Sequence, residues 1–221
     1  MSVYLITGCG RGIGRAMTEH LLSRGDTVVG SVRSGAGPVA DERFQKVTFD
    51  VRDQESINAA VAEIDGPVDV LVNNAGVMGP ESDRAYDADV DELADALDVN
   101  VLGPLRVIQA CLPLLRRSTN AKVMTISSQL GSMTFPGSSH IAYRTTKAAV
   151  NKLMQGIAID LNSEGIPLVI AHPGWVRTDM GGASAPLDPA DSARGLVKLL
   201  DELTIEATGR FMDWDGSERD W

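Results

Sequence analysis

The sequence predicts an α/β fold in which helices cover both faces of a doubly wound, mostly parallel sheet. Short runs rich in β-branched residues alternate along the chain with longer runs of helical periodicity. Several of the short runs are almost continuously apolar, as is typical of strands that are buried on both faces. No linker, repeat or low-complexity segment divides the 221 residues. We therefore expect a single domain over residues 1–221.

The elements follow one another in strict alternation. The predicted strands are residues 3–7, 27–32, 46–49, 68–72, 122–127, 167–171 and 210–214. The predicted helices are residues 12–24, 53–64, 90–117, 141–164 and 189–201, and loops are expected at 34–43 and 181–189. Crossovers between parallel strands are right-handed, and ligands of such sheets bind beyond the carboxyl ends of the strands, where the strand order reverses.

Composition and charge exclude several classes of function. A net charge of −10 argues against a nucleic-acid surface and against attraction to anionic membranes. We expect the first residues not to form a signal peptide, and we expect no apolar run to be long enough to span a bilayer. Cys9 and Cys111 lack metal-ligand spacing, and the histidines form no cluster, so we expect no metal site. These features favour a cytoplasmic protein that binds a small molecule.

Two helical runs, 90–117 and 141–164, carry apolar residues around much of their circumference. One face of each helix packs on the sheet, so a second apolar face needs another partner. A wide intramolecular contact would satisfy it. We favour a homodimer or homotetramer.

Residues 7–14, Thr-Gly-Cys-Gly-Arg-Gly-Ile-Gly, join the first strand to the first helix. A tight turn of this kind lets the backbone approach a pyrophosphate, and the helix N-terminus directs free N–H groups at the anion. The strict G-x-G-x-x-G pattern fails, and the Lys-Ser/Thr pair of a mononucleotide loop is missing. The pattern T-G-x-x-x-G-x-G does fit, with Gly8, Gly12 and Gly14 as its glycines and Ile13 between the last two.

The charges beside this loop predict which dinucleotide is preferred. Folds that are specific for NAD place a carboxylate at the end of the second strand, but here Val32 stands there and Arg33 follows. We expect Arg11 and Arg33 to converge on one corner of the pocket, where guanidinium groups suit an added phosphate. The alternative is that both arginines are solvated charges on the surface and bind no phosphate. The prediction is that NADP(H) is preferred and that NAD(H) remains possible.

Tyr143 and Lys147 are spaced so that they share one face of a helix. An ammonium one turn away would favour the phenolate and lower the tyrosine pKa from about 10 toward neutrality. Ser128 ends the fifth strand, where its hydroxyl could stabilise charge on a substrate oxygen; Ser127 points to the opposite face. The alternative is that Tyr143 and Lys147 have no catalytic role and are an ordinary interfacial tyrosine and a solvated lysine. A serine hydrolase is excluded because no G-x-S-x-G elbow is present.

Taken together, the glycine loop, "VNNAG" (72–76), "ISS" (126–128) and "YRTTK" (143–147) resemble the short-chain dehydrogenase/reductase family. The run "HPGWVRTDMGG" (172–182) and the ending of the chain look most like its C-factor-like branch. The resemblance implies a Rossmann-type sheet of about seven strands and hydride transfer between a nicotinamide cofactor and a carbonyl/alcohol pair.

The same resemblance assigns roles to individual residues. It implies that Tyr143 is the general acid/base, that Lys147 also binds the nicotinamide ribose, and that Asn100 supports a proton relay through a helix irregularity. The further cofactor contacts that it implies are Asp50 and Val51 at the adenine, the backbone of Asn74, Ala75 and Gly76, and Val176 and Thr178 at the carboxamide. Asp50 could instead cap the next helix. His140 and Trp175 are possible substrate contacts.

A second class of function stays open, a dinucleotide-binding signalling or scaffold protein, since the C-factor-like branch is named for signalling. A degraded site would favour it. The presence of Asn100, Ser128, Tyr143 and Lys147 favours the enzyme.

Overall fold

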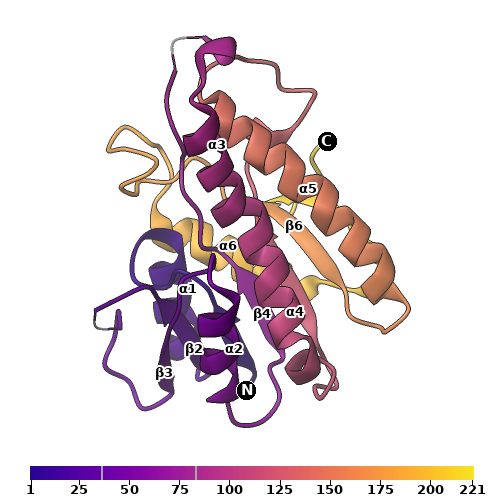
Figure 1. The fold of residues 1–221 in the computed structure, drawn as a ribbon. Helices are drawn as coiled ribbons and strands as arrows, with labels where there is room; N and C mark the ends of the chain where they lie inside the picture. The colour runs from indigo at the N-terminus through magenta and orange to yellow at the C-terminus, as the bar shows by residue number, and fades with distance from the viewer. Residues whose placement is uncertain (36, 83) are drawn as a thin grey trace.

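A computed structural model describes residues 1–35, 37–82 and 84–221. Its sheet has seven strands in the order β3-β2-β1-β4-β5-β6-β7, and each neighbouring pair is parallel. Helices cover both faces of this sheet (Figure 1). The strand order reverses between β1 and β4, so the predicted doubly wound α/β fold is confirmed.

Every predicted element is present, with bounds that differ by about two residues or less. The strands are β1 (Val3–Ile6), β2 (Thr27–Val32), β3 (Phe44–Thr48), β4 (Val70–Asn73), β5 (Lys122–Ile126), β6 (Leu168–His172) and β7 (Phe211–Asp213). The helices are α1 (Gly12–Ser23), α2 (Gln54–Ala62), α3 (Val90–Leu97), α4 (Gly103–Leu115), α5 (Ile141–Asn162) and α6 (Pro189–Glu202). Four short helical turns are η1 (Ala85–Asp87), η2 (Asp98–Leu102), η3 (Gln129–Gly131) and η4 (Ile205–Ala207). The predicted loop at 34–43 includes Ala36, which lies outside the described residues.

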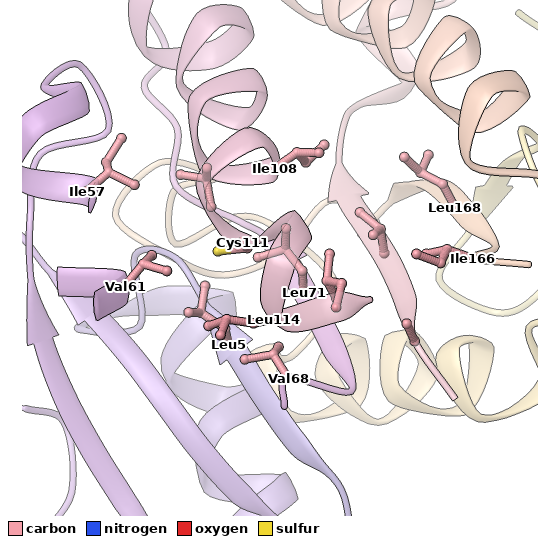
Figure 2. Close-up of a cluster of buried hydrophobic side chains, with 14 of the residues drawn as sticks. Leu5, Ile57, Val61, Val68, Leu71, Ile108, Cys111, Leu114, Ile166 and Leu168 are labelled. Atoms are coloured by element: carbon pink, nitrogen blue, oxygen red, sulfur yellow. The ribbon is translucent and has the colours of Figure 1, made fainter. Parts of the chain in front are cut away.

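The core forms two layers, one on each face of the sheet. Leu5, Leu71 and Cys111 belong to the layer that α2, α4 and α5 cover (Figure 2). Ile6 and Met17 belong to the layer beneath α1 and α6. Successive side chains of β1 thus enter opposite layers, which explains why the strand reads as continuously apolar.

Both cysteines are fully buried in these layers. Burial raises the pKa of Cys9 to about 11 and that of Cys111 to about 12. Each thiol therefore stays protonated near neutral pH and acts as a small apolar side chain.

The predicted helix 90–117 is three consecutive segments, because a π-helical turn, η2, separates α3 from α4. The run Val90–Leu115 is apolar and long enough to cross a bilayer by length and composition alone, so the expectation that no run reaches that length is wrong. Here the α4 part of the run packs in the core layer with β4 and β5. The core helices of globular proteins commonly have this length and composition.

Candidate active site

The glycine loop lies at the carboxyl end of β1, bonded to the ends of both neighbouring strands. On the β2 side, Gly8 N donates to Ser31 Oγ at 3.2 Å and Cys9 N donates to Ser31 O at 3.0 Å. On the β4 side, Thr7 Oγ1 accepts from the backbone N–H groups of Asn74 and Ala75, both at 3.0 Å. These bonds place the loop at the strand reversal, where the fold predicts a ligand site.

Close packing explains why this loop needs glycine. Gly8 has φ +70°, and a Cβ there would lie 3.0 Å from Ala75 Cα. At Gly14 a Cβ would lie 2.5 Å from both Asn74 Nδ2 and Gly8 O. The Asn74 amide occupies that space because it donates to Thr7 O at 2.8 Å. Any side chain at these positions would push the loop away from β4.

The N-terminus of α1 fits an anion. Arg11 is the extended N-cap residue, its side chain makes no capping bond, and the first turn contains no acidic residue. Ile13 packs on the core layer beneath this helix. Among the described residues, no side chain therefore accepts from the N–H groups of the first turn or neutralises the positive end of the helix dipole. Such an end suits a pyrophosphate.

Of the two arginines, Arg11 differs from expectation and Arg33 lies where it was expected, at the end of β2. Arg11 Nη1 lies 2.9 Å from Asp179 Oδ2, in the loop after β6, and the side chains are 74% and 77% exposed. Arg33 is exposed at the end of β2, where its charge adds to the larger effect of the Arg52 hydrogen bond in lowering the pKa of Asp50 at the end of β3. Arg11 is thus directed away from the corner on which both were expected to converge. Since a pair this exposed is weak, either side chain can reorient at little cost.

The turn after β3 places Asp50 and Val51 at the same edge. Bonds from the Arg52 side chain and backbone hold Asp50, at 2.8 and 2.9 Å, and lower its pKa. The N-cap of α2 is Asp53, which accepts from two backbone N–H groups of the first turn. The alternative that Asp50 caps this helix is therefore wrong. Val51 is buried against Gly103 at the start of α4, where a Cβ would lie 2.9 Å from Val51 Cγ2.

Ser128 and Tyr143 meet at the end of β5. Burial raises the tyrosine pKa, and the nearby Ser128 hydroxyl acts to lower it. The neighbouring Ser127 is fully buried and donates instead to Asn151 Oδ1 in the core. Alternation along the strand thus places Ser128 beside Tyr143, as predicted. Gly131 lies so near α5 that a Cβ there would be 2.6 Å from the carbonyl carbon of Lys147.

Lys147 lies beneath the ring of Tyr143, on the same helix. Its Nζ donates to Ile126 O at 2.8 Å and is 5.5 Å from the ring centroid. Burial lowers the pKa of Lys147 to about 8 and raises that of Tyr143 to about 12, an effect larger than the opposing effect of Ser128. Burial disfavours the charged form of both groups, so the expected lowering of the tyrosine pKa is not produced by these residues alone.

Asn100 sits inside the π-helical turn η2, which is the irregularity expected there. Its side chain donates to Val77 O at 2.8 Å and to Thr146 Oγ1 at 2.9 Å, and accepts from Val77 N at 2.9 Å. At Gly76, a Cβ would lie 3.1 Å from Asn100 Oδ1 and 3.8 Å from Lys147 Nζ. Asn100 therefore joins η2 to α5 and to the segment after β4, next to Lys147.

The loop after β6 closes toward the glycine loop. Thr178 Oγ1 accepts from Gly181 N at 3.1 Å, and Thr178 Cγ2 lies 3.3 Å from where a Cβ of Gly12 would be. Val176 is buried, whereas Trp175 is exposed and donates from Nε1 to Gly181 O. Among the described residues, no group of three or more His, Cys, Asp or Glu could hold a metal ion.

The sequence reasoning did not identify three contributors to this site. Thr7 and Ser31 fix the glycine loop to β4 and β2, and Asp179 pairs with Arg11 across the two loops. Thr7 carried a usable signal, since it opens the T-G-x-x-x-G-x-G pattern. Nothing in the local sequence marks Asp179, which is 168 residues from its partner.

Comparison with known proteins agrees with this geometry. The family model for short chain dehydrogenase matches residues 2–187. The C-signal protein of Myxococcus xanthus is 44% identical over 158 residues, 71% of this chain and 94% of that protein. The solved structure of the carbonyl reductase Sniffer of D. melanogaster superposes with a TM-score of 0.94 at 31% identity over the whole of both chains. An NADPH-bound carbonyl reductase from chicken fatty liver gives 0.90 at 28% identity, also over the whole of both chains.

The family match extends over most of the chain, and the C-signal match supports the resemblance to the C-factor-like branch. The chain belongs to the short-chain dehydrogenase family and is an oxidoreductase.

Proposed function

We propose that this chain is an NADP(H)-dependent oxidoreductase that interconverts a carbonyl and an alcohol, and that residues 1–221 form one dinucleotide-binding domain. The observation that carries the proposal is that Ser128, Tyr143 and Lys147 meet at the same edge of the sheet as the glycine loop. The similarity to an NADPH-bound carbonyl reductase supports both the reaction and the dinucleotide.

The nicotinamide dinucleotide would supply or accept the hydride. The uncapped N-terminus of α1, with Gly8, Gly12, Ile13 and Gly14, would hold its pyrophosphate. Arg11 and Arg33 would hold the phosphate on the adenosine ribose, for which a guanidinium is well shaped. The remaining contacts proposed are Asp50 and Val51 with the adenine, Asn74, Ala75 and Gly76 through their backbone, Lys147 with the ribose hydroxyls, and Val176 and Thr178 with the carboxamide.

The protein's own side chains would handle the proton. Ser128 donates a hydrogen bond to the substrate oxygen, and Tyr143 Oη gives that oxygen a proton in reduction or removes one in oxidation. With a pKa near 12 the phenol is protonated at neutral pH, the form that can donate. Lys147, with a pKa near 8, is mostly charged at pH 7 and lowers the cost of forming a phenolate on Tyr143, whose ring centroid lies 5.5 Å from Nζ. Asn100 would support the return of the proton.

The deciding experiment follows NADPH and NADH absorbance against a panel of ketones, aldehydes, quinones and alcohols, with Tyr143→Phe beside the unaltered protein. Loss of the proton donor should lower kcat by about 10²- to 10⁴-fold and leave the dinucleotide Kd unchanged. Tyr86→Phe is the matched control, because Tyr86 is 77% exposed and its hydroxyl contacts only Arg84 among the hydrogen bonds of the described residues. Near-normal turnover in Tyr143→Phe would remove Tyr143 from the mechanism.

A signalling or scaffold role is the second candidate, because a protein 44% identical to this chain is named C-signal. It predicts that the chain binds the dinucleotide but turns over no member of the panel. Turnover that Tyr143→Phe abolishes would favour the enzyme.

We also propose that the chain forms a homodimer or homotetramer and acts in the cytoplasm on a small molecule, with no nucleic-acid or membrane partner. Ile159 on α5 is 71% exposed. One turn earlier, a Cβ at Gly156 would meet nothing within 4 Å. An exposed apolar side chain beside a glycine gives a second helix room to pack closely. Light scattering at micromolar concentration tests this, and a monomer would contradict it.

A further inference from the structure

We propose that Arg144 is a positioning residue that holds the segment Ser132–His140 in one fixed conformation. We call this segment the wall; it lies between Ser128 and Tyr143 in the sequence. The catalytic consequence rests on the function proposed above, but the holding of the segment does not. Arg144 follows Tyr143 on α5, and the segment is the connection that leads from the end of β5 into that helix.

The segment wraps around the guanidinium of Arg144. Its Nε donates to Ser139 O and its Nη1 donates to Phe135 O, both at 2.9 Å. Its Cζ lies 5.5 Å from the centroid of the Phe135 ring, a cation–π distance. A Cβ at Gly137 would lie 2.6 Å from Nη2, so the backbone between the two carbonyls passes directly beside the guanidinium. One side chain thus contacts the beginning, middle and end of residues 135–139.

Little else is available to hold these residues. Positions 133–139 are all exposed, so the segment gains almost nothing from burial. A planar guanidinium can donate to two carbonyls in different directions while stacking on an aromatic ring, whereas a lysine ammonium is a single point donor. The geometry therefore requires arginine rather than a positive charge alone.

A second contact fixes the start of the segment. Thr134 N donates to Trp221 O at 3.3 Å, and the Trp221 ring stacks on Phe211 of β7 with centroids 5.6 Å apart. Arg219 holds the same tail by a bidentate pair with Asp213, each bond 2.6 Å. The wall is thus tied at one end to β7 and at the other to α5.

The position of this wall matters because both of its ends adjoin site residues. It begins directly after Gly131, whose backbone lies against Lys147, and it ends at His140, three residues before Tyr143. His140 has a left-handed backbone, with φ 53°, which an L-residue adopts only at a cost when surrounding contacts impose it. Release of the segment would let His140 relax and would loosen the spacing between Ser128 and Tyr143. Arg144 acts on the reaction only through this spacing.

Three variants test the holding of the wall without any substrate. Arg144→Ala and Arg144→Lys remove the guanidinium that contacts the wall. Gly137→Ala keeps the guanidinium but displaces it, because the new Cβ would lie against it. Gly137 is not among the positive-φ residues, so alanine causes no backbone strain there. In limited proteolysis with subtilisin, mapped by mass spectrometry, cleavage within residues 132–140 should become about ten-fold faster or more. Arg116→Lys is the control, because it weakens a bidentate pair with Glu164 remote from the wall. Circular dichroism confirms that each variant is folded; if Arg144→Ala is not, the other two decide.

In turnover assays the same variants should lower kcat for carbonyl reduction by about ten-fold or more and leave the NADPH Kd unchanged. Arg144→Lys should fail like Arg144→Ala; full rescue by lysine would show that charge alone matters and would overturn the proposal. Unchanged cleavage within the segment in all three variants would overturn it as well. If the unaltered protein reduces no carbonyl, the proposed function fails, but the proteolysis result still decides the role of Arg144.

Discussion

Replacing Lys147 by methionine should change how the stability of this protein depends on pH between pH 7 and pH 9. Lys147 is 5% exposed, and burial lowers its pKa from 10.5 to about 8. In the unfolded chain the amine keeps its ordinary pKa, so the folded state binds the proton less tightly than the unfolded state does. The charged lysine therefore destabilises the fold, fully below pH 8, and this penalty disappears as the pH rises toward 10.5.

The size of the effect follows from the two pKa values. Linkage gives a penalty of about 3 kcal/mol at pH 7 and about 2 kcal/mol at pH 9. The unfolding free energy of the unaltered protein should thus rise by about 1 kcal/mol relative to Lys147→Met over this range. The absolute difference between the two proteins is less informative. Methionine also leaves Ile126 O without its donor, which costs about 1–3 kcal/mol at every pH.

The assay is urea unfolding at several pH values between these limits for the unaltered protein, Lys147→Met and Lys152→Met. The thiols of Cys9 and Cys111 begin to titrate near pH 9 in the unfolded chain, where burial no longer raises their pKa, but they are shared by all three proteins and cancel in the differences. Lys152 is exposed on the same helix, and its variant serves as the control for removing a lysine charge from that helix. If the difference between the unaltered protein and Lys147→Met stays constant from pH 7 to pH 9, Lys147 keeps an ordinary pKa and the argument from burial fails.

Three further predictions concern other parts of the molecule. Arg33→Ala should raise the Kd for NADPH about ten-fold or more and leave that for NADH unchanged, with the exposed Arg15→Ala as control; equal changes in titration calorimetry would refute the role of Arg33. Gly14→Ala should lower both the melting temperature and dinucleotide affinity because its Cβ overlaps Gly8 O, whereas Gly156→Ala, on α5 and outside the dinucleotide contacts, should leave the dinucleotide affinity unchanged. Ile159→Arg should convert the proposed oligomer to monomer in light scattering, and an unchanged mass would place the interface elsewhere.

The fold could be predicted from the sequence because its signals are local. Continuous apolar runs mark strands that are buried on both faces, and the glycine loop marks the turn from β1 to α1. The break at η2 could not be located from periodicity, since the apolar pattern continues through it. At η2 the Asn100 amide bonds both backbone groups of Val77, which is 23 residues away. The family resemblance implied a helix irregularity at Asn100. The contact with Val77 could not be predicted, because it joins residues that are far apart in the sequence.

For the candidate site too, the sequence predicted which residues lie there better than it predicted which residues they contact. Motif spacing predicted that Ser128, rather than Ser127, lies beside Tyr143, because alternation along a strand is a local rule. It did not predict that Arg11 pairs with Asp179, since that contact depends on how the loop after β6 crosses the glycine loop. Exposed charges choose partners by proximity in three dimensions, and spacing along the chain carries little information about it.

Tyr143 and Lys147 show most clearly why charge states could not be predicted from spacing. One helical turn places the two groups on a common face, and from that alone an ammonium should stabilise a phenolate. The fold adds burial of both groups, which raises the pKa of Tyr143 to about 12 and lowers that of Lys147 to about 8. Near pH 7 the pair therefore holds a neutral phenol above a mainly charged amine, the combination in which a proton can leave the tyrosine while the lysine stabilises the remaining anion. Above pH 8 the amine loses its charge before the phenol loses its proton. The same burial that keeps Tyr143 protonated thus limits the pH range over which Lys147 can assist it.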